Sequence, residues 1–401
     1  MNIVVAQSGG PTAAINATLA GVIKAGFEAG EIETVYGSLH GIEGLINDNL
    51  IDISTKVKND DDIKLLAATP SSALGSCRYK MKNPNEDPSD YEKVFAVMEA
   101  RNIGAFFYIG GNDSMDTVNK MSIYAKENGK SQRIIGVPKT IDDDLCVTDH
   151  TPGFGSAAKY VTTTMKEILC DAEVYDLKSV TIVEIMGRDA GWLTASSVLL
   201  RNDGSSAPHL IYLPESDISV QTLISDVKAQ LEKHNSVMIA LSEGVILDGQ
   251  ATSSSGTVDN FGHLVMSGAS KTVEDIVKKE IGCKVRSIEL NVMQRCGSHI
   301  ASKTDIDESL MIGQAAVKAM LNGETGKMMA FKRVSEDPYK VEIISADTAD
   351  VANHVKHFPQ EWITDHGSNV SDEAIKYFLP LIQGENEVIY ENGLPKQIKL
   401  K

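Results

Sequence analysis

The sequence is poor in cysteine. It has five cysteines in 401 residues, an odd number, and they lie far apart along the chain. It contains no Cys-x-x-Cys pair and no group of Cys and His at the spacing of a zinc site. This scarcity argues against a disulfide-stabilised secreted domain and against a structural zinc centre. We expect a cytoplasmic protein with reduced thiols at Cys77, Cys146, Cys170, Cys283 and Cys296.

Long apolar runs and an excess of basic residues are absent as well. No run approaches the roughly 18 to 20 apolar residues of a membrane span, and the first residues lack the basic stretch that opens a signal peptide. Lysine and arginine number 38 against 55 aspartates and glutamates, so the formal net charge is −17. This acidic excess is spread along the chain and argues against nucleic acid or an anionic membrane as a partner. An anionic ligand must therefore be held by local basic residues and backbone N–H groups.

Two alternating patterns are present instead. Hydrophobic residues make up 42% of the chain, enough for a folded protein of two or three domains at roughly 150 residues each. Short apolar runs, typical of strands buried on both faces, occupy residues 3–6, 105–109, 134–137, 180–185 and 237–241. A period near 3.6 residues predicts helices at 13–27, 90–101, 116–127, 157–170, 219–234 and 307–321. The alternation predicts an α/β fold with mainly parallel sheets.

Polar segments and prolines mark the rest of the chain. Residues 82–89 are rich in Pro, Asn and Asp, and residues 248–262 contain a run of serines. Both predict loops rather than domain linkers. Residues 331–401 differ in character, with mixed short elements and four prolines. We expect them to form an appended subdomain or a cap.

Two glycine turns each follow an expected strand and precede an expected helix. They lie at residues 8–12 (SGGPT) and 110–114 (GGNDS). Glycine lets the backbone approach a ligand closely, and the N–H groups of the following helix N-terminus suit an anion. Ligands of open parallel sheets bind beyond the carboxyl ends of the strands, where both turns would lie. The alternative is a pair of tight turns in which Asn112, Asp113 and Ser114 simply cap a helix.

A cluster of three carboxylates follows the run at 134–137. Residues 138–144 read PKTIDDD, so Asp142, Asp143 and Asp144 lie together beside Lys139. Clustered acids raise one another's pKa values and cost stability unless a cation or a proton-transfer role explains them. Mg²⁺ takes oxygen ligands and bridges phosphates, so it would suit this cluster. A solvated acidic loop is the alternative.

Four arginines are candidates for binding a sugar phosphate, because a guanidinium can hold a phosphate through two hydrogen bonds. They are Arg78, Arg188, Arg286 and Arg295. Arg188 follows an expected strand, and Glu243 lies at the end of another. Surface ion pairing is the usual fate of any single arginine.

Taken in order, the motifs resemble those of the phosphofructokinases. They are GG at 9–10, GSCR at 75–78, GGNDS at 110–114, PKTIDDD at 138–144, GFGSA at 153–157, MGRDAGW at 186–192, SEG at 242–244 and QRCG at 294–297. The resemblance covers roughly residues 1–330. It implies two doubly wound α/β domains with the active site between them. The implied units are a phosphoryl-donor domain at 1–138 with about 296–330, a fructose 6-phosphate domain at 139–295 and a C-terminal extension at 331–401.

The same resemblance implies Mg²⁺-dependent phosphoryl transfer to the 1-hydroxyl of fructose 6-phosphate. Asp142 would take the proton of that hydroxyl as general base, and Thr140 would contact the transferring phosphoryl group. The implied catalytic residues are Asp142, Thr140, Lys139 and Arg188. The implied metal ligands are Asp113, Asn112 and Asp144. Family members usually carry Asp where this chain has Asn112, so its amide oxygen or Asp113 would have to serve the metal.

The implied binding residues form two sets. The sugar phosphate would be held by Met186, Gly187, Arg188, Glu243, Arg286 and Arg295. The phosphoryl donor would contact Gly9, Gly10, Arg78, Gly111, Asp113, Ser114 and Lys139. This reaction mainly needs positioning and charge neutralisation, which such residues provide.

Two positions favour pyrophosphate over ATP as the donor. ATP-dependent members resemble GGDGS and PGTID, whereas this chain has Asp113 and Lys139 in place of two of those glycines. A negative charge at 113 should repel the α-phosphate of a nucleotide, and Lys139 adds a cation suited to a small, highly charged anion. Both changes resemble the pyrophosphate-dependent members. An ATP-dependent 6-phosphofructokinase is the alternative.

A noncatalytic sugar-phosphate sensor is a more remote alternative. It would require loss of the base, yet Asp142 and Thr140 are both present. The resemblance further implies a homodimer or homotetramer, and symmetric assembly is common among soluble enzymes. Asp143 departs from the family pattern, which commonly has Asn there.

Overall fold

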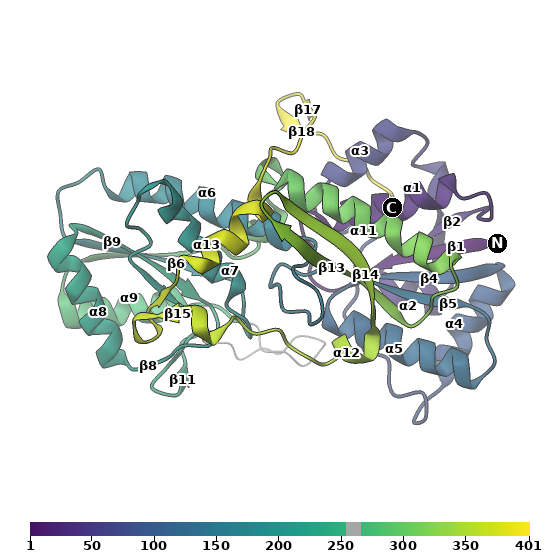
Figure 1. Ribbon diagram of the computed structural model, residues 1–401, viewed down its shortest axis with the longest axis horizontal. Coiled ribbons are helices and arrows are strands. Elements are labelled where there is room, and N and C mark those ends of the chain that lie inside the picture. Colours follow the sequence, from purple (N-terminus) through teal and green to yellow (C-terminus); the bar gives the residue numbers. More distant parts are fainter. Residues whose placement is uncertain (254–265) are drawn as a thin grey trace.

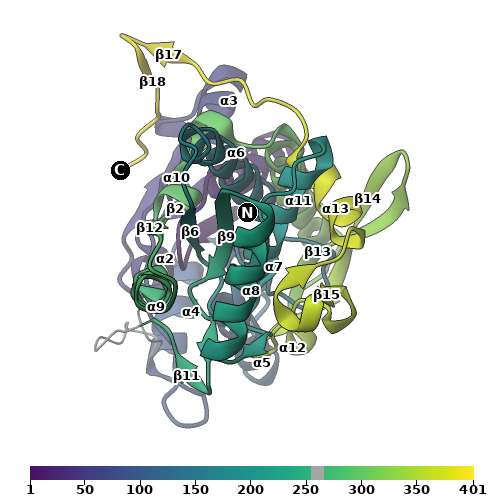
Figure 2. The same ribbon diagram turned by 90° about the vertical axis from the view of Figure 1, so that its left-hand side faces the viewer.

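The computed structural model describes residues 1–253 and 266–401 and has two lobes, each built on its own β-sheet (Figure 1). The first lobe holds the N-terminus and a seven-stranded sheet, and the second holds a four-stranded sheet. Figure 2 looks at the molecule from the side of the second lobe and shows helices around its strands. The predicted α/β fold with two mainly parallel sheets is confirmed.

The first sheet has a parallel centre and an antiparallel strand at each edge. Its strands, in sheet order, are β14 (Tyr339–Asp347), β13 (Lys327–Glu336), β5 (Arg133–Pro138), β4 (Ile103–Gly110), β1 (Asn2–Gln7), β2 (Val35–Ser38) and β3 (Leu50–Asp52). Successive residues of β1 point to opposite faces, so that Ile3 and Val5 join one apolar cluster while Val4 and Ala6 join another. This double burial explains the continuous apolar run in the sequence.

Helices cover both faces of the first sheet. One face packs on α1 (Ile15–Glu28), α3 (Asp60–Ala68) and α11 (Lys303–Leu321), and the other on α2 (Gly41–Ile46), α4 (Ser89–Ala100) and α5 (Asn112–Glu127). The backbones of α1 and α11 touch, because each helix has a glycine at the contact: Gly21 in α1 and Gly313 in α11. A Cβ on Gly21 would lie 2.1 Å from the carbonyl oxygen of Leu310, and one on Gly313 would lie 2.2 Å from that of Thr18. Any larger residue at either glycine would push the helices apart.

The second sheet is wholly parallel. Its strands, in sheet order, are β12 (Lys284–Glu289), β6 (Ser179–Ile185), β9 (Ser236–Ser242) and β7 (Leu210–Tyr212). Val180 and Ile182 of β6 face α8 (Val220–Lys233) and α9 (Ala269–Ile281), whereas Val183 and Ile185 face α6 (Phe154–Ala172) and α7 (Trp192–Ala195). A small sheet beside this lobe is formed by β8 (Asp217–Ile218), β10 (Ile246–Leu247) and β11 (Gln250–Ala251).

The C-terminal residues belong to both lobes. The expected start of the extension at residue 331 lies inside β13, so the β13–β14 pair is part of the first sheet. After α12 (Thr348–Val351) the chain crosses to the second lobe, where Phe358 and Phe378 join its core (Figure 1). It then returns, and Leu400 packs in the core of the first lobe. The elements of this path are β15 (Ile363–Thr364), β16 (Asn369–Val370), α13 (Glu373–Phe378), β17 (Tyr390–Glu391) and β18 (Leu394–Pro395).

The structure contains the strands and helices that the sequence predicts. All five predicted strands and all six predicted helices are confirmed, with ends that shift by a few residues. The loop predicted at 82–89 is confirmed as far as Pro88, because α4 begins at Ser89. In the loop predicted at 248–262, Gln250–Ala251 instead form the short strand β11, and residues 254–262 lie outside the described residues. Within the described ranges, no helix is both long enough and apolar enough to cross a membrane.

Candidate active site

A cavity of about 540 Å³ lies between the two sheets. Most of its lining comes from six loops, each of which begins directly after the last residue of a parallel strand, and Arg78, Met266 and Ser267 line it from other segments. The first lobe contributes the loops after β1, β4 and β5, and the second contributes those after β6, β9 and β12. Carboxyl ends of parallel strands are where α/β proteins bind ligands. The cavity is therefore the candidate active site.

Most of the residues singled out in the sequence line this cavity. They are Gly9, Gly10, Arg78, Gly111, Asn112, Asp113, Ser114, Lys139, Thr140, Asp142, Asp144, Met186, Arg188, Glu243 and Arg295. Gly187 adjoins it, and its backbone N–H donates a 3.4 Å hydrogen bond to Oε1 of Glu243. The predicted set therefore converges from both lobes.

Arg286 is the exception. It is the third residue of β12, whose carboxyl end lies at Glu289, so its side chain is not at the cavity edge of the sheet. Its guanidinium instead lies on the exposed surface, 2.7 Å from the carboxylate of Asp171 at the end of α6. The structure thus does not bring Arg286 to the site of its own chain.

The backbone of the glycine turn after β1 lies close to two cationic side chains, those of Lys139 and Arg295. Lys139 is buried, and its ammonium donates a 2.7 Å hydrogen bond to the carbonyl of Gly10. A Cβ on Gly9 would lie 3.2 Å from Nζ of Lys139, and one on Gly10 would lie 3.1 Å from a guanidinium nitrogen of Arg295. Gly9 has a φ of +73°, which favours glycine. The turn therefore leaves room for an anion to contact both cations.

Burial and neighbouring charges act together on Lys139. Burial lowers the pKa of its ammonium, and Arg295 and Arg78 lower it further. Asp142 and Asp144 oppose this effect, and the pKa is about 8. An anionic ligand would relieve the repulsion among these cations, because it supplies the missing negative charge.

The turn after β5 presents the candidate base. The backbone N–H of Asp142 donates a 3.0 Å hydrogen bond to the hydroxyl of Thr140, which fixes the start of the turn. Burial raises the pKa of Asp142, and the carboxylate of Asp144 raises it further. Arg188 and Lys139 act in the opposite direction, and the pKa is about 7. A carboxylate with a pKa near neutrality can accept a proton in the reaction and release it afterwards.

Asp144 fits a magnesium ligand better than the other two candidates do. Its Oδ1 atom is buried and has no hydrogen-bond partner among the described residues. Burial raises the pKa of Asp144, and it outweighs the opposing effects of hydrogen bonds and of the Lys356 charge. The described residues contain no group of three or more His, Cys, Asp or Glu side chains that could hold a metal ion. Mg²⁺ often binds through one or two carboxylates, with phosphates and water completing its shell.

Asn112 has a different use in the structure. Its Oδ1 accepts a 2.5 Å hydrogen bond from the backbone N–H of Asn353, and its Nδ2 donates one of 2.5 Å to the carbonyl of His354. Both ends of the amide therefore bind the C-terminal chain. Asp113 lies at the cavity, with its carboxylate 3.6 Å from the ammonium of Lys80.

The second-lobe side of the cavity holds another carboxylate, that of the partly buried Glu243. Burial raises the pKa of Glu243, the nearby charge of Asp142 raises it further, and the pKa is about 8. Sequence reasoning missed Gln294, a buried side chain whose Oε1 accepts a 3.2 Å hydrogen bond from the N–H of Met186. It also missed residues 353–358 of the C-terminal chain, which contact several site loops. No motif marks residues 353–358, but the unusual Asn112 and Asp143 that they contact were a usable signal.

Cations, glycine turns and a carboxylate of raised pKa at the ends of parallel strands in two sheets are typical of an enzyme of phosphoryl transfer. Residues 2–320 match the phosphofructokinase family, and the chain belongs to that family. The resemblance found in the sequence is thereby confirmed.

Individual relatives resemble the chain over its whole length. It is 40% identical to the pyrophosphate–fructose 6-phosphate 1-phosphotransferase of Halomonas elongata and 41% identical to that of Xanthomonas campestris pv. campestris, in each case over 100% of this chain and 96% of the relative. The crystal structure of a pyrophosphate-dependent phosphofructokinase from Nitrosospira multiformis superimposes with a TM-score of 0.89 at 36% identity, covering 100% of this chain and 96% of that one. The C-terminal residues beyond the family match are therefore shared with these relatives.

Proposed function

We propose that this protein transfers a phosphoryl group from pyrophosphate to the 1-hydroxyl of fructose 6-phosphate, giving fructose 1,6-bisphosphate and orthophosphate. The observation that carries the proposal is the buried Lys139, held between the glycine turns and the base Asp142. Its compact ammonium suits a small anion of high charge. The names of full-length relatives support the same donor.

The site residues divide the chemistry among themselves. The 1-hydroxyl oxygen attacks one phosphorus of pyrophosphate, and the bond from that phosphorus to the bridging oxygen breaks. Asp142 takes the hydroxyl proton, and the bridging oxygen leaves as part of orthophosphate. Lys139 and Arg188 neutralise charge that moves between the two oxygens, and Thr140 contacts the transferring group. The pKa of about 7 for Asp142 allows the same carboxylate to return the proton in the reverse reaction.

Binding residues on either side of Asp142 hold the two substrates. We propose that Gly9, Gly10, Arg78, Gly111, Asp113 and Ser114 face pyrophosphate, and that Met186, Gly187, Arg188, Glu243 and Arg295 face the sugar phosphate. The position of Arg286 supports no role in the site of its own chain. In this proposal residues 1–138 supply most of the donor side and residues 139–295 most of the sugar side.

We propose Mg²⁺ as the metal, with Asp144 as its main protein ligand and Asp113 as the second. The unpartnered, buried Oδ1 of Asp144 supports this choice, whereas the hydrogen bonds of Asn112 argue against a metal role for its amide. When bound, Mg²⁺ would neutralise pyrophosphate oxygens and hold them in a fixed orientation.

The cellular setting is part of the same proposal. We expect a cytoplasmic homodimer or homotetramer, as the family resemblance implies. All five cysteines are free in the structure, which is in keeping with a reducing compartment.

Steady-state formation of fructose 1,6-bisphosphate tests the proposal. The purified protein is assayed with Mg²⁺ and fructose 6-phosphate, with pyrophosphate or ATP as donor. We expect kcat/KM for pyrophosphate to exceed that for ATP by roughly a hundredfold or more, about 2.7 kcal/mol in transition-state binding. A preference for ATP would leave the family and the base in place but overturn the donor. No turnover with either donor would favour the sugar-phosphate sensor.

A further inference from the structure

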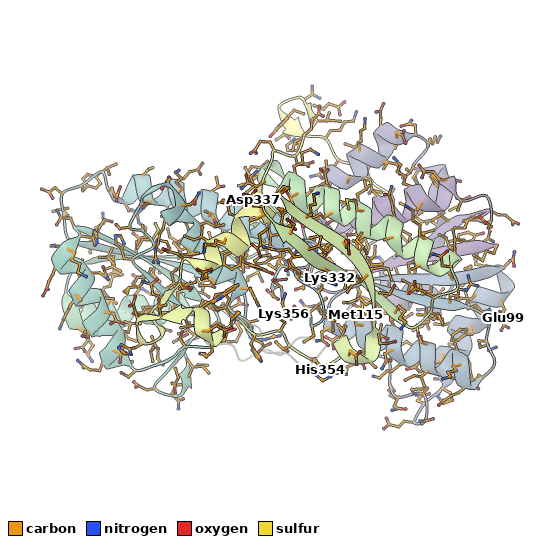
Figure 3. All side chains as sticks on the ribbon, viewed as in Figure 1. Glu99, Met115, Lys332, Asp337, His354 and Lys356 are labelled. Carbon is orange, nitrogen blue, oxygen red and sulfur yellow. The ribbon has the colours of Figure 1, made fainter. Side chains whose placement is uncertain are left out.

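Residues 353–358, called the strap below, link the two sides of the candidate active site. At one end the strap binds the donor turn, where the amide of Asn112 forms its two hydrogen bonds with Asn353 and His354. The side chain of Asn353 also donates a 3.2 Å hydrogen bond to Asp116 of α5. Figure 3 shows His354 and Lys356 between the two lobes. The donor turn is therefore joined directly to the C-terminal chain.

The other end of the strap binds the loop after β6 on the sugar side. The ring of His357 lies 3.1 Å from the carbonyl of Asp189, and the indole N–H of Trp192 donates a 2.8 Å hydrogen bond to the carbonyl of Lys356. The N–H groups of Phe358 and Gly191 both donate to Oε1 of Glu215, at 2.9 and 3.0 Å. The strap thus contacts the loops that face both substrates.

The middle of the strap binds the turn that carries the base. The backbone N–H of Lys356 donates a 2.8 Å hydrogen bond to the carbonyl of Asp144. Its ammonium lies 3.1 Å from the carboxylate of Asp143 and donates a 2.8 Å hydrogen bond to the carbonyl of Asp149. The face of the Trp192 ring lies 4.8 Å from the same ammonium. Lys356 is therefore held on several sides and is not a mobile surface lysine.

Asp143 lies at the centre of these contacts. Its side chain is fully buried, and the hydroxyl of Tyr377 in α13 donates a 2.9 Å hydrogen bond to its carboxylate. Its φ is +54°, which a residue with a Cβ rarely adopts. The side chains of Asp142 and Asp144 line the cavity, whereas that of Asp143 points away from it to the C-terminal chain. The C-terminal chain therefore contacts the turn through the carboxylate of Asp143.

We propose that Lys356 and Tyr377 are positioning residues for catalysis. By binding the carboxylate of Asp143 they hold its left-handed backbone, and this conformation directs the neighbouring carboxylate of Asp142 into the cavity. The proposal rests on the proposed function, in which Asp142 is the base. It gives the C-terminal residues beyond the family match at 320 a part in the reaction without contact to either substrate.

Kinetics of two variants test this role. Lys356→Met keeps most of the side-chain stem but removes the ammonium, and Tyr377→Phe removes only a hydroxyl. We expect kcat with pyrophosphate to fall roughly ten- to a hundredfold for Lys356→Met, because small misplacements of a reacting group have effects of this size. KM for both substrates should stay within about twofold, since neither residue lines the cavity. Lys356→Arg should restore kcat to within about fivefold of the parent, and Tyr377→Phe should show a smaller fall with the same pattern.

Matched controls come from the same C-terminal chain. Lys376 is exposed and paired with Glu373, so Lys376→Met should leave kcat unchanged. Tyr390 is exposed, so Tyr390→Phe should do the same. A double variant adds a sharper test, because Asp143→Asn with Lys356→Met removes both buried charges together. It should be more active than Lys356→Met alone if the lysine acts through Asp143.

Hydrogen–deuterium exchange gives a readout that needs no turnover. Amides of residues 140–151 should exchange faster in Lys356→Met and Tyr377→Phe than in the parent, and should not change in Lys376→Met. Unchanged exchange there, or a kcat for Lys356→Met within twofold of the parent, would overturn the positioning role. If the parent itself shows no phosphoryl transfer, or if Asp142→Ser keeps full activity, the proposed function fails instead. The exchange result then still decides whether the strap holds the turn.

Discussion

The turn at residues 142–144 separates two groups of charges that differ in how well they are paired. On the cavity side, Asp142, Glu243 and Lys139 have pKa values of about 7, 8 and 8, each moved toward neutrality by burial before any other cause. On the side of the C-terminal chain, His150 binds carboxylates with both ring nitrogens, at 2.9 Å from Asp149 and 2.8 Å from Glu308. Among the described residues, Asp142, Glu243 and Lys139 form no ion pair, whereas His150 is paired with two carboxylates of the same chain.

Buried charged groups therefore have two uses in this chain: some stabilise the fold, and others are available to a ligand. Arg333 completes the second group with a 3.0 Å ion pair to Asp149, and the ring of Phe331 stacks on that of His150. Buried charges with partners join the strand β13 to the loop at 145–153 and stabilise the fold there. Buried charges without an ion pair store electrostatic energy, which a bound polyanion can relieve at Lys139 and a cation such as Mg²⁺ would relieve at the carboxylates. We therefore take incomplete pairing, rather than burial alone, as the mark of the active site.

Removing the base should have the largest effect on the cavity side. Asp142→Ser should lower kcat by roughly two or more orders of magnitude, because proton transfer to a positioned base contributes that much. Binding of fructose 6-phosphate, measured by calorimetry, should change little, since Asp142 acts in the transition state. Asp61→Ser, at an exposed position of α3, is the matched control. Activity within about tenfold of the parent would remove Asp142 from the role of base.

Changing the charges of the donor side should have the next largest effect. Asp113→Gly together with Lys139→Gly removes the two residues that distinguish this chain from the ATP-dependent pattern. We expect kcat/KM for pyrophosphate to fall by roughly tenfold or more, because the buried cation is lost. KM for fructose 6-phosphate should stay within about twofold and serves as the internal control. Pyrophosphate kinetics equal to those of the parent would refute the selectivity argument.

The smallest expected effect concerns His150 of the paired group, which should make the free energy of unfolding depend on pH. Burial by itself lowers the pKa of His150, but hydrogen bonds to Asp149 and Glu308 outweigh it and raise the pKa to about 9. The folded value lies above the unfolded value of about 6.5. The imidazolium therefore stabilises the fold fully below about pH 6.5, and its contribution is lost as the pH rises through about 9.

Urea unfolding at several pH values measures this contribution. The free energy of unfolding of the parent should decline between about pH 6.5 and 9. His150→Gln has no proton to lose in this range, so its decline should be shallower. Equal slopes for parent and variant would show that His150 is not held as an imidazolium.

The sequence predicts those strands and turns that are determined by neighbouring residues in the chain. The central strands are buried on both faces, so they appear as continuous apolar runs, and the turns after them show the glycines that close approach requires. Sequence reasoning missed β12, where buried Val285 is followed by the exposed Arg286, because an edge strand carries no such run. Arg286 was predicted to bind the sugar phosphate from its residue type and from the family resemblance, and neither says on which part of a strand a residue lies.

The strap could not be predicted for a related reason. It binds through backbone groups of residues 353, 354, 356 and 358, which any sequence can supply. From the C-terminal chain, the side chains of Lys356 and Tyr377 contact the turn, and they lie more than 200 positions from Asp143 in sequence. Such partners become visible only when the fold has brought them together.

The touching backbones of α1 and α11 have a consequence for how the chain folds during synthesis. Nearly all of α1 is buried, yet α11 follows it only after the whole second sheet has been made. Until Lys303–Leu321 leaves the ribosome, the α1 surface around Gly21 stays exposed, and β13 is not yet there to pair with β5. The first lobe therefore begins the chain but is completed last. Nascent chains shorter than about 340 residues should depend on chaperones, because the second lobe also lacks Phe358 and Phe378 of its core at that length.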